Sequence, residues 1–184
     1  IKDYLNDTQL KGLQYYDDMQ VRIPYEEIQK HEIYLKDILY KIDPKSELTI
    51  AGSYRRKNKD SGDIDLLLKS STKKMYDAFI DILVKEGYLT CQLARGSKKY
   101  MGMGKIGSSP CHRRIDIMYT KPEEYPFAIL YFTGSGDFNK NMRSFALKKG
   151  YTINEYGIHY VDTKIKIKTK TEEDIFLTLG LEYV

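Results

Sequence analysis

Two aspartates, Asp63 and Asp65, are separated by a single residue at the start of an apolar run, and this pattern constrains the fold more than any other. In an extended strand, side chains at positions i and i+2 point to the same face, so we expect both carboxylates to lie side by side. The run Leu66, Leu67 and Leu68 is typical of a strand that is covered on both faces. Carboxylates in such a place repel each other unless a cation lies between them. The pattern therefore predicts a largely buried strand with a cation site at its beginning.

A glycine turn precedes this strand, at the end of another expected strand over residues 48–51. The backbone N–H groups of Gly52-Ser53 and the Ser53 hydroxyl can bind phosphate oxygens, and Arg56 can neutralise them. Because Mg²⁺ usually binds one or two carboxylates together with substrate phosphates, residues 51–68 predict a site for a metal and a nucleoside triphosphate. The alternative is a surface turn followed by a solvated acidic strand edge.

A third carboxylate, Asp116, lies in the strand that we expect over residues 113–119. If this strand lies beside the first, three carboxylates converge and could hold two cations about 3.5–4 Å apart, which stabilises attacking and leaving oxygens in phosphoryl transfer. The residues between Asp65 and Asp116 are enough for the helix and hairpin that such an arrangement requires. The alternative is a single strand aspartate that pairs with Arg113 or Arg114.

Composition and charge favour a compact intracellular protein that contacts a polyanion. The 184 residues fit one domain or two small subdomains, and no apolar run approaches the length of a membrane span. Cys91 and Cys111 are expected to be reduced thiols rather than a bridge. The net charge is −1 over residues 1–90 and +5 over residues 91–184, a bias that fits a nucleic acid partner.

Hydrophobic periodicity predicts an α+β chain without repeats. Pro24 suits the first turn of a helix with Ile28, Ile33 and Leu35 on its apolar face, and Thr72 can cap another helix. Gly102, Gly104 and Gly107 predict a loose hairpin end. Helices are expected over residues 1–16, 24–42, 72–85, 127–133, 138–149 and from 171 onward, and strands over 48–51, 64–69, 90–94, 98–105, 113–119, 151–153, 157–161 and 164–168.

Six segments occur in the order seen in the family X DNA polymerases, and the chain resembles that family over nearly its whole length. The segments are Gly52–Arg56, Ser61–Asp65, Arg113–Ile117, Tyr131–Ser135, Phe138–Arg143 and Tyr151–Tyr156. The first two mark only the wider nucleotidyltransferase superfamily, whereas the fourth and fifth are specific to the polymerases.

The resemblance implies an α+β fold that covers the catalytic part of such an enzyme. Residues 22–122 would be a nucleotidyltransferase palm, a mixed β-sheet with two flanking helices. Residues 123–184 would be a small C-terminal α/β subdomain that selects the nucleotide and binds the nascent base pair, and residues 1–21 a remnant of the helical subdomain that binds duplex DNA. Without an amino-terminal lyase domain, duplex binding would be weak and sensitive to salt.

The activity that the resemblance implies is a DNA-directed DNA polymerase of repair type, as in base excision repair. It would add a deoxynucleotide from a dNTP to a primer 3′-hydroxyl in short gaps, with two Mg²⁺ ions, or Mn²⁺ in their place. Gapped or primer–template DNA and dNTP would be its partners. We expect a monomer without membrane association, in the nucleus, or in the cytoplasm if the protein is viral or prokaryotic.

The resemblance also implies a role for each matching position. Asp63 and Asp65 would hold both metal ions, and Asp116 would hold the catalytic one and orient the primer hydroxyl or accept its proton. Tyr131 and Phe132 would screen the sugar against a 2′-hydroxyl. The nucleotide-binding positions would be Arg22, Gly52, Ser53, Arg56, Ser61, Gly62, Tyr131, Phe132, Gly134 and Asn139, with Asn139 at the minor-groove edge of the base. The DNA-binding positions would be Lys99, Arg114, Tyr131 and Arg143, with Arg114 also positioning Asp116.

Two positions depart from the family member that the chain resembles most. Gly136 replaces an aspartate that packs on the incoming base, so stacking of the nucleotide is expected to be weaker. Met118 replaces an arginine that holds the residue matching Asp65, so we expect Asp65 to be freer to bind metal. Core packing would also explain Tyr131 and Phe132, and an ion pair with Glu155 would also explain Arg143.

Two other functional classes remain compatible with parts of the pattern. A template-independent nucleotidyltransferase acting on RNA, protein or a small molecule would share Ser53 and the three aspartates, but it would not need segments 131–135 and 138–143. A non-catalytic DNA-binding or scaffold protein would tolerate loss of a metal ligand, yet all three carboxylates are present.

Overall fold

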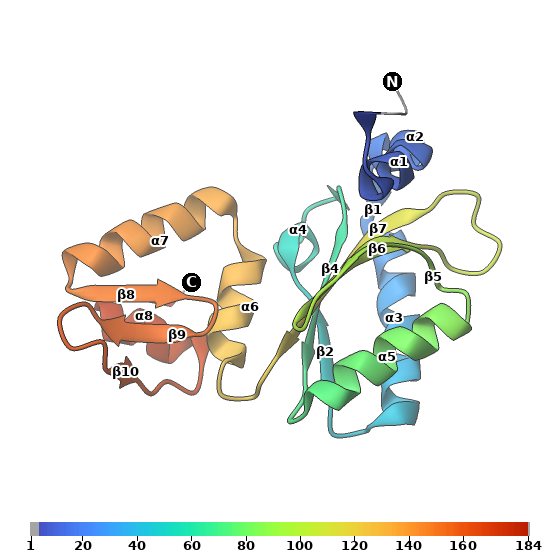
Figure 1. The fold of residues 1–184 in the computed structure, drawn as a ribbon. Helices are drawn as coiled ribbons and strands as arrows, with labels where there is room; N and C mark the ends of the chain where they lie inside the picture. The colour runs from blue at the N-terminus through green and yellow to red at the C-terminus, as the bar shows by residue number, and fades with distance from the viewer. Residues whose placement is uncertain (1–3, 184) are drawn as a thin grey trace. The chain divides into compact units, whose positions relative to one another are not determined.

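The computed structural model describes residues 4–183, and the chain divides into two compact units with a boundary between Tyr119 and Thr120 (Figure 1). Each unit has a hydrophobic core of its own. The first expected helix begins at Asp7 rather than Ile1, and Ile1 to Asp3 lie outside the described residues. The fold is α+β, as the periodicity predicts.

A five-stranded sheet with the strand order β2-β4-β7-β6-β5 forms the centre of the first unit. The neighbours β2 and β4, β5 and β6, and β6 and β7 pair antiparallel. The apolar run correctly predicts β4, which is an inner strand of the sheet and largely buried. The strands are β2 (Glu47–Ile50), β4 (Ile64–Lys69), β5 (Leu89–Arg95), β6 (Lys99–Gly104) and β7 (Arg113–Thr120).

Two helices, α3 (Tyr25–Ile42) and α5 (Lys73–Lys85), lie side by side and share the core with the sheet (Figure 1). Pro24 lies at the N-cap of α3 with an extended backbone (ψ of 149°) and belongs to β1 (Ile23–Pro24), so it precedes the helix instead of occupying its first turn as expected. The predicted apolar face of α3 is wrong at Ile33, which is 70% exposed, and His31 is buried instead. Thr72 occupies the N-cap position of α5, but its side chain makes no capping hydrogen bond.

Short elements connect the sheet to the beginning of the unit. Helices α1 (Asp7–Gln14) and α2 (Tyr16–Gln20) lead to β1 (Ile23–Pro24), which pairs with β3 (Asp60–Ser61). The expected glycine turn after β2 is a single helical turn, α4 (Gly52–Arg55). The pairing of β1 with β3 places Arg22 next to the loop that leads into β4.

The glycines of β6 make close cross-strand contacts, so the expected loose hairpin end is wrong. Gly102 pairs with Ile115 of β7, and a Cβ atom at Gly102 would collide with the carbonyl oxygen of Cys91 and with the Tyr100 hydroxyl. A Cβ atom at Gly104 would lie 2.9 Å from the carbonyl oxygen of Tyr88. These glycines therefore let neighbouring strands and ring groups approach β6 closely.

The second unit packs three helices with an antiparallel sheet of order β10-β9-β8. Ser135 caps the second helix by accepting a hydrogen bond from the Phe138 N–H, which favours the start of that helix. The expected edge strand over 164–168 is an edge strand, but only Lys166–Ile167 pair. The elements are α6 (Tyr125–Thr133), α7 (Gly136–Lys148), β8 (Tyr151–Asn154), β9 (Gly157–Tyr160), β10 (Lys166–Ile167) and α8 (Glu172–Leu179).

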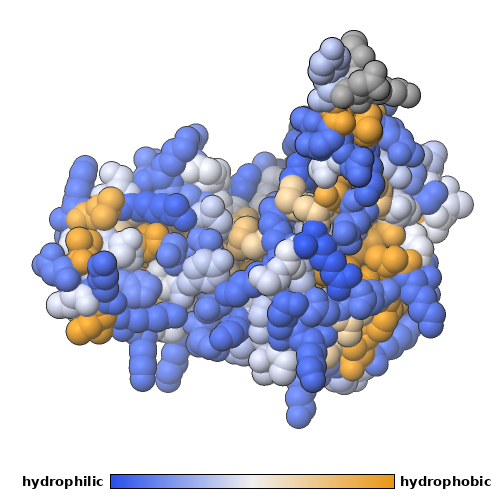
Figure 2. Space-filling model, viewed as in Figure 1, coloured by the Kyte–Doolittle hydropathy of each residue, from blue (hydrophilic) through white to orange (hydrophobic). Residues whose placement is uncertain are grey.

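The surface is mainly hydrophilic, with separate apolar patches on the face that Figure 2 shows. Exposed apolar side chains such as Ile165 and Leu177 are scattered, which is normal for a protein surface. Among residues 4–183, no helix combines the length and the apolar character that crossing a membrane would require.

Candidate active site

The three aspartates lie on neighbouring strands of the first unit. Asp63 directly precedes β4, Asp65 is its second residue, and Asp116 lies in the middle of β7. Because β4 and β7 are adjacent in the sheet, the expectation that the two strands lie side by side is confirmed. Asp63 and Asp65 are half-buried and Asp116 is only 4% exposed, so Asp116 is the aspartate most shielded from water.

Burial and neighbouring charges perturb the ionisation of Asp63 and Asp65. Burial first, and then the charges of Asp63 and Asp116, raise the pKa of Asp65 to about 7. Burial and the charge of Asp116 also raise the pKa of Asp63. A raised carboxyl pKa means that the negative form is disfavoured where it stands, so the nearby charges of Lys99 and Arg114 do not fully offset burial and the neighbouring carboxylates. Perturbed carboxylates of this kind are typical of functional sites.

Two cations hold Asp116. Lys99 Nζ lies 3.0 Å from Asp116 Oδ2, and Arg114 donates from Nε and Nη2 to Oδ1 and Oδ2, at 3.2 and 3.3 Å. The alternative prediction that Asp116 pairs with Arg113 is wrong. The Arg113 guanidinium instead donates to both carboxylate oxygens of Glu27, at 2.6 and 2.8 Å. Asp116 thus pairs with Arg114, while it also acts on the other two aspartates.

The donor set fits divalent cations, although the side chains are not arranged around one. Within the described part of the chain, no three His, Cys, Asp or Glu side chains form a group that could hold a metal ion as they stand. Asp116 is turned toward Lys99 and Arg114 instead. Carboxylate oxygens are the ligands that Mg²⁺ and Mn²⁺ prefer, and the three aspartates at β4 and β7 supply them.

The helical turn α4 lies against Asp65. Gly52 has a φ of +56°, and a Cβ atom there would lie 2.5 Å from Asp65 Oδ2, so only glycine fits this position without strain. The Ser53 hydroxyl donates a hydrogen bond to the Ser61 hydroxyl at 2.7 Å. The structure therefore brings together the predicted residues Gly52, Ser53, Ser61 and Asp65.

Two arginines predicted to bind nucleotide lie in the same unit. Arg22 donates from Nε to Asp60 Oδ1 at 2.9 Å, and its Nη1 would lie 3.0 Å from a Cβ atom at Gly62. Its charge also acts on Asp63. Arg56 is exposed at the end of α4. The Asp60 contact holds Arg22 beside the entry to β4, and the sequence pattern does not predict this contact.

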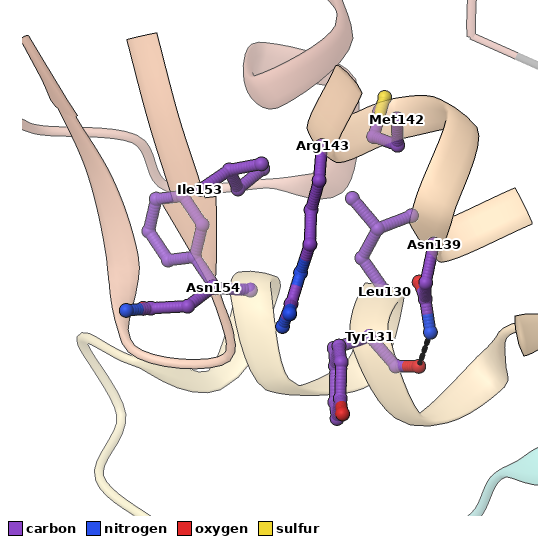
Figure 3. A pocket seen from close by; sticks show the side chains of 8 residues that line it. Leu130, Tyr131, Asn139, Met142, Arg143, Ile153 and Asn154 are labelled. Carbon is purple, nitrogen blue, oxygen red and sulfur yellow. Dashed lines mark hydrogen bonds between the residues drawn. The ribbon is translucent and has the colours of Figure 1, made fainter. Parts of the chain in front are cut away.

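The remaining predicted site residues belong to the second unit, where Tyr131, Asn139 and Arg143 lie beside one another (Figure 3). Asn139 donates from Nδ2 to the carbonyl oxygen of Tyr131 at 2.8 Å, and the Arg143 guanidinium lies over the Tyr131 ring at 5.0 Å. The rings of Tyr131 and Phe132 meet edge to face, and both residues are half-buried at the end of α6. Gly134 follows with a φ of +63°.

Packing within the unit accounts for part of this arrangement. Arg143 lies 3.6 Å from Glu155, which is the ion pair that the sequence also allows. The cavity beside Tyr131, Asn139 and Arg143 is small, about 20 Å³. Gly136 begins α7 with open space around its Cα, so a side chain at that position would be accommodated.

Comparison with known families matches both units. Residues 22–122 match the family model described as the DNA polymerase beta palm, and residues 128–184 match the one described as the DNA polymerase beta thumb. The two matches together cover most of the chain.

Known relatives include two kinds of enzyme. DNA polymerase lambda of Rattus norvegicus is 32% identical over 97% of this chain, and DNA polymerase lambda of Arabidopsis thaliana is 26% identical over 100%. DNA nucleotidylexotransferase of Xenopus laevis is 26% identical over 100%. The chain spans only 35%, 39% and 46% of these relatives' lengths, respectively. Because the palm model alone matches more than half of the residues, the chain belongs to the family X DNA polymerases.

Proposed function

We propose that the chain is the catalytic part of a DNA-directed DNA polymerase of repair type, which adds a deoxynucleotide from dNTP to a primer 3′-hydroxyl. The observation that carries the proposal is the group of three aspartates at the start of β4 and in β7, in which the charge of Asp116 acts on the other two, next to the Gly52-Ser53 turn. Family membership and the similarity to DNA polymerase lambda support the choice of DNA as substrate. Short gaps in DNA are the proposed substrate.

The aspartates would hold two Mg²⁺ ions, or Mn²⁺ in their place, with Asp63 and Asp65 shared by both ions and Asp116 reserved for one. When bound, such ions lower the pKa of a hydroxyl and stabilise charge on phosphate oxygens. Asp116 would orient the primer 3′-hydroxyl or accept its proton, and Arg114 would hold the Asp116 carboxylate in place. The burial of Asp116 favours this role, because little water competes for it.

Each unit carries residues for which we propose a contact with the nucleotide. The α4 backbone, the hydroxyls of Ser53 and Ser61, and the backbone at Gly62 would bind the triphosphate, with Arg22 and Arg56 neutralising its charge. Tyr131, Phe132 and Gly134 would contact the sugar, and Asn139 the minor-groove edge of the base. Lys99, Arg114, Tyr131 and Arg143 would contact DNA.

Primer extension on DNA with a one-nucleotide gap tests the proposal. With Mg²⁺ and each dNTP supplied separately, we expect insertion of the nucleotide that is complementary to the template base. The Asp116→Ala protein should lose at least about 10³-fold in rate, since both a metal ligand and the group next to the hydroxyl are removed. Equal rates for the two proteins would refute the mechanism.

Template-independent transfer to DNA is the second candidate, because DNA nucleotidylexotransferases are among the relatives. The same gap assay separates the two functions when a single-stranded primer is offered beside the gapped duplex. A templated enzyme should use the gapped duplex and select one nucleotide. A template-independent enzyme should extend the single strand and use all four nucleotides.

A further inference from the structure

Lys99 occupies a position on the sheet from which it can bind Asp116 but is not fixed there. It is the first residue of β6, and its Cα pairs with Met118 of β7, while Met101 pairs with Asp116. Lys99 and Asp116 are therefore diagonal neighbours, a separation that a long side chain can span. The directly opposite Met118 carries no charge, so the Lys99 ammonium extends to Asp116 Oδ2 at 3.0 Å.

The two cations on Asp116 differ in how firmly they are held. Arg114 lies two residues away on the same strand and contacts both carboxylate oxygens with its planar fork. Lys99 contacts one oxygen through a flexible stem, and its side chain is 42% exposed, whereas that of Asp116 is 5% exposed. Lys99 is thus the partner that can exchange Asp116 for another anion in solution without a change in β7.

The Asp116 carboxylate cannot serve Lys99 and a divalent cation equally well. Oδ2 already receives both the Lys99 ammonium and an Arg114 N–H, which leaves less of its electron density for a metal ion. A positive charge 3.0 Å from this oxygen would also repel a divalent cation beside it. Removing Lys99 from Asp116 should therefore increase the affinity of the carboxylates for metal.

We propose that Lys99 is a displaceable counter-ion that occupies Asp116 until a DNA phosphate draws it away, so that DNA binding and metal binding at Asp116 are coupled. This inference rests on the proposed function, in which Asp116 is a metal ligand. By linkage the coupling is reciprocal: DNA raises the affinity for metal by the same factor as metal raises the affinity for DNA.

Mn²⁺ titration of the whole 184-residue chain, followed by electron paramagnetic resonance, tests the inference. Without DNA, Lys99→Met should bind Mn²⁺ about tenfold more tightly than the wild type. Lys99→Arg, which keeps the charge, should stay close to the wild type. Lys41→Met is the matched control, since it removes an exposed lysine that pairs with Asp37 at 2.6 Å on α3; it should change the affinity less than twofold.

Addition of gapped DNA completes the test. DNA should tighten Mn²⁺ binding by the wild type and have little effect on Lys99→Met, because the counter-ion is already absent. If Lys99→Met and Lys41→Met bind Mn²⁺ equally while Asp116→Asn weakens binding, the inference is wrong and the proposed function stands. If Asp116→Asn leaves Mn²⁺ binding unchanged, the proposed function fails, and the inference fails with it.

Discussion

At the candidate active site, burial disfavours the charged form of single residues. Asp65 has a pKa of about 7 instead of 3.8, because it is buried beside Asp63 and Asp116. His31 lies at the opposite extreme: it is buried, its Nδ1 is 2.7 Å from the Tyr88 hydroxyl, and burial lowers its pKa to about 4. The first perturbation concerns the proposed chemistry, and the second concerns the stability of the core.

Replacing Asp65 should stabilise the metal-free protein at high pH. Since the folded-state pKa is raised, the native protein loses stability as the pH rises from about 4 through 7. Asp65→Asn has no such charge, so we expect it to be more stable than the wild type by about 1–2 kcal/mol at pH 8 in EDTA, and by much less at pH 5. Urea unfolding at both pH values measures this. Asp137→Asn, at an 88% exposed side chain, is the control and should show no such pH dependence.

His31 should make the protein sensitive to acid. Its folded-state pKa is lowered from 6.5, so the stability that it contributes is present above pH 6.5 and is lost as the pH falls toward about 4. The loss should reach about 3 kcal/mol over this range. His31→Gln, which can still hydrogen-bond Tyr88 but does not titrate, should show a flatter profile in urea unfolding between pH 7 and 4.5. Parallel profiles would contradict this assignment.

At the level of helices and strands, local signals predict most elements and long-range packing explains the errors. The bounds of β4 follow from its apolar run and flanking turns. Ile33 satisfies the helical period, yet it is exposed, because the face that α3 buries depends on which strands and helix it meets. The ion pair between Asp116 and Arg114 can be predicted from the sequence, because both residues lie on the same face of one strand. The contact between Asp116 and Lys99 cannot, because it depends on the pairing register of β6 and β7.

Gly102 shows how a cross-strand contact decides the cost of a substitution. Gly102→Ala would drive a methyl group into the Cys91 carbonyl oxygen and the Tyr100 hydroxyl, so β5 or β6 must shift. We expect a loss of about 1–3 kcal/mol in the free energy of unfolding. Gly12→Ala, in a helix with no atom within 4 Å of the new methyl group, should be neutral or stabilising by up to about 1 kcal/mol. Equal effects of the two substitutions in urea unfolding would contradict the packing of β6.

For the whole molecule, the proposed activity conflicts with the stability of the metal-free fold. The first unit carries three aspartates at the start of β4 and in β7, and Lys99 and Arg114 pair directly with one of them, Asp116. Functional sites commonly contain such unfavourable buried charge, and a bound ligand of opposite charge offsets it. A cation that binds the folded chain and not the unfolded chain should therefore raise the melting temperature.

Thermal unfolding with and without Mg²⁺ measures this relief. At a concentration about 100 times the dissociation constant, Mg²⁺ should stabilise the wild type by about 2.7 kcal/mol. Asp65→Asn and Asp116→Asn should lose most of this gain, even though Asp65→Asn is the more stable protein in EDTA at pH 8. NaCl of equal ionic strength controls for screening and should reproduce little of the effect. If Mg²⁺ and NaCl stabilise all three proteins alike, the aspartates do not form a metal site, because general screening would then account for the whole response.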